Sequence, residues 1–210
     1  MFAARDLKVE EVRAMAVACV VPPLESVLEE VARRYLSVDP LFVAPGIKTG
    51  MPVLVDHPLE VGADRIVNGV AAFTRFQRAV IVVDFGTATT FDAVSDKGEY
   101  LGGAIAPGLK ISAQALFEAT AKLPRIDLKR PERAIGRSTV SSMQSGILFG
   151  YVGLVRGILD RMREEMGSAP SVIATGGLTP LLERDLAGWV DEVDPDLTLK
   201  GLRILHERNR

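Results

Sequence analysis

Short apolar runs and longer amphipathic stretches alternate along this chain. Apolar runs rich in Val and Ile and bounded by turn residues predict buried strands. Apolar residues that recur every three or four positions predict helices. The patterns predict helices over residues 9–13, 24–36, 60–76, 108–121, 139–166, 179–187 and 201–208, and strands over residues 14–21, 41–44, 79–83, 88–95, 100–106, 171–174 and 189–193. This order of elements predicts an α/β fold.

The segment AVIVVDFGTATTFDAVS contains the first candidate site. Its apolar strand ends at Asp84, and residues 85–87 form a glycine turn into the next strand. Backbone N–H groups of such a hairpin, with the hydroxyls of Thr87 and Thr89, can hold a phosphate. Asp84 can then face a cation that bridges the phosphates. The alternative is a plain hairpin whose Asp and Thr side chains only stabilise the turn.

A second candidate site lies upstream, where GADR precedes the apolar helical stripe of IVNGVAAF. Asp64 and Arg65 fall in the first turn of that helix. A carboxylate there can accept the proton of a substrate hydroxyl, and an arginine can hold an anion. The alternative is an acid stabilised by the helix dipole beside a solvated arginine. The pairing with the phosphate hairpin favours the functional interpretation.

One known family shares five segments of this chain in the same order and approximate spacing: GADRIVN, DFGTATTFD, YLGGAIAPGL, RSTVSSMQSG and ATGG. The similarity runs from about residue 16 to residue 209, nearly the whole chain. The chain resembles the type III pantothenate kinases, also known as Bvg accessory factors, in the acetate and sugar kinase, Hsp70 and actin superfamily. A superfamily kinase that acts on a sugar or acetate is not expected to carry GADR and GGAIAPG together.

The resemblance implies a role for each matching residue. Asp64 matches the family's proton acceptor, which deprotonates the primary hydroxyl of pantothenate so that it attacks the γ-phosphate of ATP. Asp84 matches the ligand of a monovalent cation, K⁺ or NH₄⁺, and Thr87 matches a contact to the ATP phosphates. The neighbours of Asp64 that match the pantothenate site are Gly62, Ala63 and Arg65.

Two later motifs are also implied to contribute. Thr139 matches a threonine that completes the pantothenate pocket from across a dimer interface. Gly176 and Gly177 resemble a turn on the adenosine side, where the lack of side chains lets a nucleotide approach the backbone. The alternatives are that Thr139 is the N-cap of the long helix and that ATGG is a plain strand-to-helix turn.

The resemblance further implies a fold and an assembly. The superfamily has a ribonuclease-H-like, actin-like ATPase fold of two related half-domains. This predicts a truncated first half-domain over residues 1–77 and a second over residues 78–210. The implied reaction uses ATP with Mg²⁺ and is the first step of coenzyme A biosynthesis. The implied assembly is a homodimer, and the broad apolar face of the 139–166 helix supports either a dimer or simple core packing.

The chain departs from the family's pattern in two places. Members begin with a phosphate hairpin of the form DxGNT, and no such motif precedes GADR here. Three strands and a helix are therefore expected to be missing, from a start codon placed too far downstream or from a genuinely shortened paralogue. Losing part of the phosphate clamp predicts poor activity, and the alternative is a non-catalytic or regulatory relative that keeps the pantothenate pocket. Val55 stands where members commonly carry a substrate-contacting tyrosine.

Composition narrows the class of protein. Lys and Arg number 25 against 27 Asp and Glu, so no basic surface for nucleic acid or membrane is predicted. The single cysteine excludes a disulfide framework, and no apolar stretch reaches transmembrane length. A cytoplasmic enzyme acting on small molecules is expected.

Overall fold

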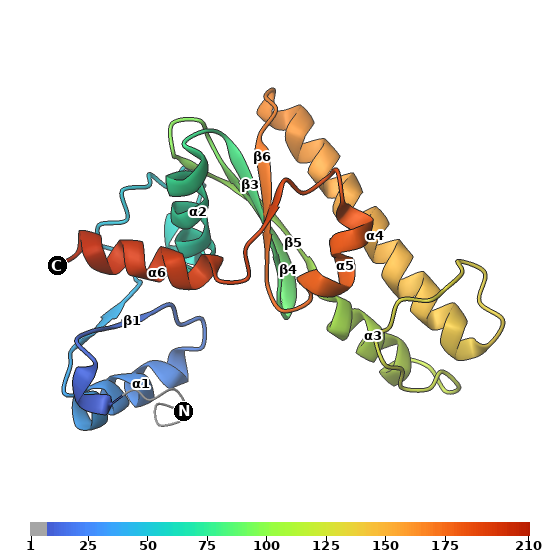
Figure 1. The fold of residues 1–210 in the computed structure, drawn as a ribbon, viewed down its shortest axis with the longest axis horizontal. Coiled ribbons are helices and arrows are strands. Elements are labelled where there is room, and N and C mark those ends of the chain that lie inside the picture. Colours follow the sequence, from blue (N-terminus) through green and yellow to red (C-terminus); the bar gives the residue numbers. More distant parts are fainter. Residues whose placement is uncertain (1–7) are drawn as a thin grey trace.

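A five-stranded mixed sheet forms the centre of the protein (Figure 1). The structure, a computed structural model, describes residues 8–210. The strands are β3 (Val80–Phe85), β4 (Ala88–Val94), β5 (Tyr100–Pro107), β6 (Ser171–Thr175) and β7 (Glu192–Val193). Their order across the sheet is β5-β4-β3-β6-β7, with β4 antiparallel to β3 and β5, β6 parallel to β3, and β7 parallel to β6. The predicted α/β class and the predicted three-strand meander are confirmed.

Helices cover both faces of this sheet (Figure 1). One face carries α2 (Ala63–Phe76) and α6 (Leu197–Arg208), and the other carries α3 (Leu109–Glu118), α4 (Thr139–Met166) and α5 (Thr179–Leu186). Successive residues of β3 point to opposite faces, so Val82 packs with the first group and Val83 with the second. The apolar run of β3 is therefore continuous because both of its faces are buried. No helix within residues 8–210 is long and apolar enough to cross a membrane.

The residues before α2 form a small layer and a segment that returns to the sheet. The layer contains β1 (Met15–Val17), α1 (Glu25–Val31), a π-helical turn (Ala32–Leu36) and β2 (Pro40–Phe42), with 3-10 turns at Val9–Glu11 and Pro22–Leu24. Residues 43–61, with a 3-10 turn at Pro58–Glu60, pack against α2 and the sheet, where Val53 forms a parallel bridge with Tyr100 of β5. Within residues 8–210, β1 pairs only with β2, in parallel. The predicted half-domain boundary at residue 77 stays a prediction, and α6 packs on α2 across it.

Several predicted boundaries were wrong. The strand predicted over residues 14–21 ends at Val17, and Val20 and Val21 are exposed because no neighbouring strand continues beside them. The helix predicted from residue 60 begins at Ala63, after a separate 3-10 turn, and Gly62 is its N-cap. The last helix begins at Leu197, four residues earlier than predicted. The prediction for α4 was confirmed at both ends.

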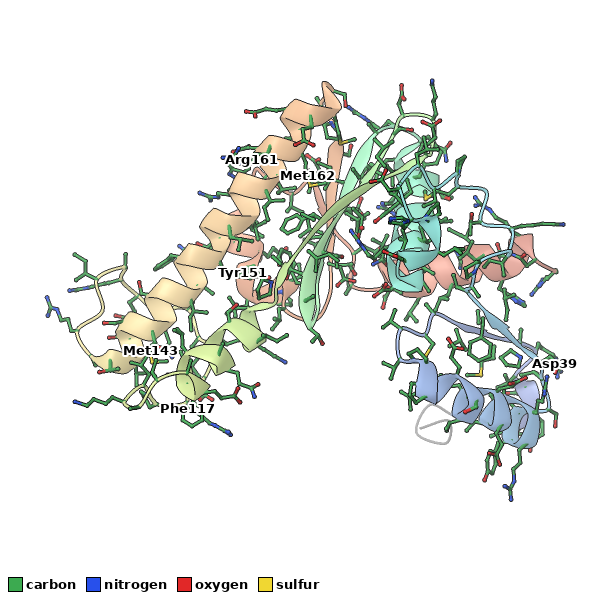
Figure 2. The ribbon with its side chains drawn as sticks, turned by 180° about the vertical axis from the view of Figure 1, so that it is seen from behind. Asp39, Phe117, Met143, Tyr151, Arg161 and Met162 are labelled. Carbon is green, nitrogen blue, oxygen red and sulfur yellow. The ribbon has the colours of Figure 1, made fainter. Side chains whose placement is uncertain are left out.

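Tyr151 links α4 to the sheet beneath it (Figure 2). Its ring packs near that of Phe85, and its hydroxyl hydrogen-bonds with Thr89. Thr89 is completely buried. The prediction that its hydroxyl helps to hold a phosphate was therefore wrong, because that hydroxyl is used inside the core.

Close packing between α2 and α6 depends on Gly201. A Cβ atom at this position would overlap the backbone carbonyl oxygen of Val67. We expect Gly201→Ala to lower the free energy of unfolding by about 1–3 kcal/mol, because the two helices would be pushed apart. Urea unfolding measures this change.

Leu199→Ala is the matched control on the same helix. Leu199 is 66% exposed, so its truncation should change the free energy of unfolding by less than about 0.5 kcal/mol. Equal stability of Gly201→Ala and the parent chain would contradict the close packing of α2 and α6.

Candidate functional site

Three turns meet at the end of β3, where Asp84 lies. They are the β3–β4 hairpin, the turn from β5 into α3 and the turn from β6 into α5. A Cβ atom on Gly176, in the third turn, would lie 2.6 Å from Asp84 Oδ1, and the φ angle of Gly176 is +94°. A Cβ atom on Gly108, in the second turn, would overlap the carbonyl oxygen of Thr87. Both positions require glycine, which lets backbone from two other turns close around the hairpin.

The carboxylate of Asp84 has two different sides. Its Oδ2 accepts a hydrogen bond of 3.0 Å from the amide of Asn68, one turn inside α2. Its Oδ1 faces Gly176 and accepts no hydrogen bond from residues 8–210. Burial raises the pKa of Asp84, the hydrogen bond from Asn68 opposes this, and the charges of Asp64 and Asp92 raise it further. A cation at Oδ1 would relieve this accumulation of negative charge.

Asp64 lies in the first turn of α2, on the same side as Asp84. Its Oδ1 accepts a hydrogen bond of 2.9 Å from the backbone N–H of Arg65. A Cβ atom on Gly62 would lie 2.7 Å from the same oxygen, so this glycine leaves the acid accessible. Asp64 is partly exposed, and its charge contributes to the raised pKa of Asp84. Asn68, one helical turn after Asp64, donates to Asp84, so the acid of GADR and the acid of the hairpin belong to the same edge of the sheet.

Arg65 is bound to the sheet by a buried ion pair. Its Nε donates to Asp92 Oδ1 at 2.6 Å, and Asp92 is completely buried. The Tyr100 hydroxyl donates to the same oxygen at 2.7 Å. Burial raises the pKa of Asp92, while Arg65, Tyr100 and Thr90 oppose that rise. The alternative of a solvated arginine was wrong, because only 15% of the Arg65 side chain is exposed.

Part of the Arg65 guanidinium is left without a partner. Its Nη2 is buried and makes no hydrogen bond within residues 8–210. The nitrogen lies beside Gly103 of β5, where a Cβ atom would be 3.1 Å from it. An unpaired buried N–H group is costly, so this side of Arg65 is suited to an additional anionic or carbonyl partner.

The remaining predicted positions near this site are open or apolar. Ala63 lines an apolar cavity of about 260 Å³ with residues of the 43–53 and 58–61 segments. Val55 is half-buried, with its Cγ1 at 3.5 Å from the position of a Cβ on Gly102. Thr87 is exposed at the hairpin tip, and the space around Gly177 is open.

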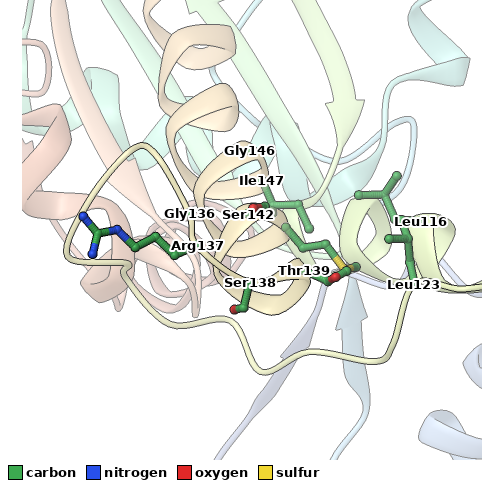
Figure 3. A pocket seen from close by; sticks show the side chains of 10 residues that line it. Leu116, Leu123, Gly136, Arg137, Ser138, Thr139, Ser142, Gly146 and Ile147 are labelled. Carbon is green, nitrogen blue, oxygen red and sulfur yellow. The ribbon is translucent and has the colours of Figure 1, made fainter.

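Thr139 lies elsewhere in the same chain. It is the first residue of α4, at the end of that helix far from α2 (Figure 1). It lines an open pocket of about 860 Å³ between the start of α4 and the region of Leu116 and Leu123 (Figure 3). Neither Asp64 nor Asp84 lines this pocket. The N-cap of α4 is Ser138, which accepts from the Ser141 N–H at 3.2 Å, so the N-cap alternative for Thr139 was wrong.

Four polar residues at this site were not singled out from the sequence: Asn68, Asp92, Tyr100 and Thr198. Asn68 is 1% exposed and interrupts the apolar stripe of α2, and Asp92 is buried in the middle of β4. A polar residue at a position where the sequence pattern predicts a buried apolar one is the signal that could have identified Asn68 and Asp92. Thr198 carries no such signal, because its partner Asn68 is 130 residues away.

The buried charge of Asp92 generates a pH-dependent prediction. Tyr100→Phe removes a donor to this carboxylate, which raises its pKa further above the value in the unfolded chain. Stability is then retained at acid pH and lost as pH rises through the pKa of folded Asp92. We expect a loss of about 1–3 kcal/mol at pH 7 and a smaller loss at pH 4, by urea unfolding. Tyr35→Phe is the control, since Tyr35 is 61% exposed. If Tyr100→Phe lost equal stability at both pH values, its effect would not come from the charge of Asp92.

Comparison with known proteins places this chain in a family. The family model described as type III pantothenate kinase matches residues 1–161. A type III pantothenate kinase from Anaeromyxobacter sp. (strain Fw109-5) is 59% identical over 210 residues, which cover this whole chain and 82% of that protein. The corresponding kinase from Koribacter versatilis is 55% identical, with 76% of it covered.

A solved structure shares the fold of this chain. A Baf-family protein from Campylobacter jejuni, named as a transcriptional activator, superposes with a TM-score of 0.60 at 19% identity. The match covers 96% of this chain and 86% of that one. The sequence relationships, rather than this fold likeness, determine the family. The chain belongs to the type III pantothenate kinase family.

Proposed function

We propose that the protein transfers the γ-phosphate of ATP to the primary hydroxyl of pantothenate, giving 4′-phosphopantothenate in the first step of coenzyme A biosynthesis. Membership of the kinase family supports the reaction. The observation that carries the site is the hydrogen bond from Asn68 to Asp84, because Asn68 lies one helical turn after Asp64 in α2 and so brings both acids to one edge of the sheet. Because the reaction consumes ATP, a cytoplasmic location is also proposed.

In this proposal Asp64 is the proton acceptor. Its position at the start of α2 leaves it partly exposed, with one oxygen already oriented by the Arg65 N–H. The carboxylate takes the hydroxyl proton as the new oxygen–phosphorus bond forms and the bond between the γ-phosphorus and ADP breaks. Gly62 and Ala63 border the substrate, and Arg65, with 15% of its side chain exposed, supplies a positive charge beside it. The ion pair with Asp92 holds the guanidinium of Arg65 in place.

ATP is proposed to bind along the turns around β3. Thr87, exposed at the hairpin tip, contacts the phosphates, and Gly176 and Gly177 border the adenosine side. Residues 8–210 contain no group of three or more His, Cys, Asp or Glu side chains that could hold a metal ion. This donor set fits Mg²⁺ that arrives with the nucleotide, because Mg²⁺ is commonly held by substrate phosphates and few carboxylates. Bound Mg²⁺ would neutralise charge that develops on the transferred phosphoryl group.

Asp84 is proposed to hold the monovalent cation, K⁺ or NH₄⁺. Its Oδ1 lies 2.6 Å from the position of a Cβ on Gly176 and 3.7 Å from that of a Cβ on Gly86, and its single negative charge would be balanced by one singly charged ion. The bound cation would offset the negative charge of Asp84 beside the phosphates. Burial and neighbouring acids raise the pKa of this carboxyl group, and a bound cation would oppose that rise.

The sheet is proposed to be the second of two related half-domains of a ribonuclease-H-like fold. Three antiparallel strands are followed by parallel strands on the other side of β3, in the order expected for that half. The layer formed by β1, β2 and α1 would belong to the first half-domain. The proposed boundary lies near residue 77.

A homodimer through α4 is proposed as the assembly that completes the site with Thr139 of a second copy. One exposed face of α4 carries four glycines at which an added Cβ atom would meet no other atom of residues 8–210 within 4 Å: Gly146, Gly150, Gly153 and Gly157. Glycines cost a helix about 1 kcal/mol each, so a stripe of them in open solvent has no benefit to a monomer. Such a stripe would let a second helix approach closely.

The role of Asp64 generates the main functional prediction. Asp64→Asn keeps the size of the side chain but removes the proton acceptor, so we expect the rate of pantothenate-dependent ADP release to fall by about 10²–10⁴-fold. The melting temperature should stay close to that of the parent chain. Asp56→Asn, which changes an exposed acid outside the site, is the control and should keep full activity.

Two outcomes would contradict the proposed function. Retained activity in Asp64→Asn would remove this residue from the role of base. A parent chain that binds pantothenate but releases no ADP would favour the alternative of a non-catalytic relative.

The dimer proposal generates a prediction for the glycine stripe. Gly153→Leu should convert a dimer to a monomer, seen as a halved mass in light scattering after gel filtration, because the side chain separates the helices. Glu183→Leu, which places a leucine at an exposed position of α5, should leave the mass unchanged. A monomeric parent chain, stabilised by Gly153→Leu through better helix propensity, would refute the α4 interface.

A further inference from the structure

We propose that Thr198 and Asn68 are positioning residues that orient the carboxylate of Asp84 toward its cation. The inference rests on the proposed role of Asp84, and it adds α6 to the machinery of the site. Thr198 lies outside the region that the family model matches and outside every motif that the sequence brought forward. Its connection to Asp84 exists only in the folded protein.

A chain of two hydrogen bonds joins the three side chains. The Thr198 hydroxyl donates to Asn68 Oδ1 at 2.7 Å, and Asn68 Nδ2 donates to Asp84 Oδ2 at 3.0 Å. The acceptor-only carboxylate requires the NH₂ group of Asn68 to face it, which leaves Asn68 Oδ1 pointing to Thr198. Thr198 supplies the donor that this oxygen needs and thereby holds the amide in place against Asp84.

Burial makes this arrangement specific. Asn68 is 1% exposed, so water cannot replace the hydroxyl of Thr198 if that hydroxyl is lost. With Oδ2 bound to Asn68, Asp84 presents Oδ1 to the space beside Gly176, and a Cβ atom there would fill the space at 2.6 Å. The chain of hydrogen bonds thus selects which oxygen of Asp84 is available to a ligand.

The start of α6, which carries Thr198, is itself held firmly. Lys200 pairs with the buried Asp194 just before the helix at 2.6 Å, and the N–H of Asp196 donates to the same acid at 3.0 Å. Farther along, Gly201 packs directly on the backbone of Val67 in α2. These contacts fix the distance between Thr198 and Asn68, so the hydroxyl acts as a rigid support rather than a mobile contact.

The test measures cation binding in two ways. In the first, KCl is added to the substrate-free protein, and the KCl concentration that gives half of the maximal rise in melting temperature is recorded. Choline chloride keeps the ionic strength constant. The other is the KCl concentration for half-maximal ADP release. We expect Thr198→Val to raise both concentrations by about 3- to 10-fold while the rate at saturating K⁺ changes by less than 2-fold. Thr198→Ser, which restores the hydroxyl, should restore both values.

Two controls separate positioning from general stability. Thr74→Val makes the same change at an exposed position of α2 and should leave both KCl concentrations unchanged. In an Asn68→Ala background, Thr198→Val should have no further effect on either concentration, because the intermediate group is gone. Additive effects in the double variant would show that Thr198 does not act through Asn68.

The failure of this inference can be distinguished from failure of the proposed cation role. If the parent chain responds equally to K⁺ and Na⁺ in both measurements, Asp84 does not hold a selective monovalent ion and both proposals fall. If the parent chain requires K⁺ but Thr198→Val only lowers the melting temperature, with unchanged half-saturation, the positioning role alone is refuted.

Discussion

The buried ion pair between Arg65 and Asp92 is the interaction on which the arrangement of the site depends. Asp92 is completely enclosed, so its charge requires the guanidinium at 2.6 Å and the Tyr100 hydroxyl at 2.7 Å. Because Arg65 is in the first turn of α2, satisfying Asp92 fixes the rotation and depth of that helix on the sheet. Asp64 precedes Arg65 by one residue, so the same contact fixes its position at the edge of the sheet where Asn68 of α2 reaches Asp84.

Close backbone approach is the second constraint. Gly176 and Gly108 lie where any side chain would meet the β3–β4 hairpin, so turns from both sides of β3 can close around Asp84. The central position of β3, between antiparallel β4 and parallel β6, brings those turns to one edge of the sheet. Clefts beside the carboxyl ends of parallel strands are where α/β proteins commonly bind ligands. The chemistry of the site then comes from a few polar groups on a rigid apolar frame.

Distant segments contribute to this small region. α2 supplies Asp64, Arg65 and Asn68, and the sheet supplies Asp84 and Asp92. α6 adds Thr198 from near the end of the chain, by packing on α2 through Gly201. Thr139 differs from these residues. It lies away from Asp64 and Asp84 in its own chain, and only the Thr139 of a second copy could approach them.

The sequence by itself determined the local elements, the family and the residues whose chemistry is strong in any context. Apolar periodicity predicted α4 and the β-meander, because these patterns record which face each element buries. The motifs identified Asp64 and Asp84, whose roles remain proposals. Only the tertiary structure decided that Arg65 pairs with Asp92, that Thr89 is used in the core, and that Thr198 reaches Asp84 through Asn68. Hydrogen bonds between residues far apart along the chain leave no local pattern, since their geometry is set by the packing of whole elements.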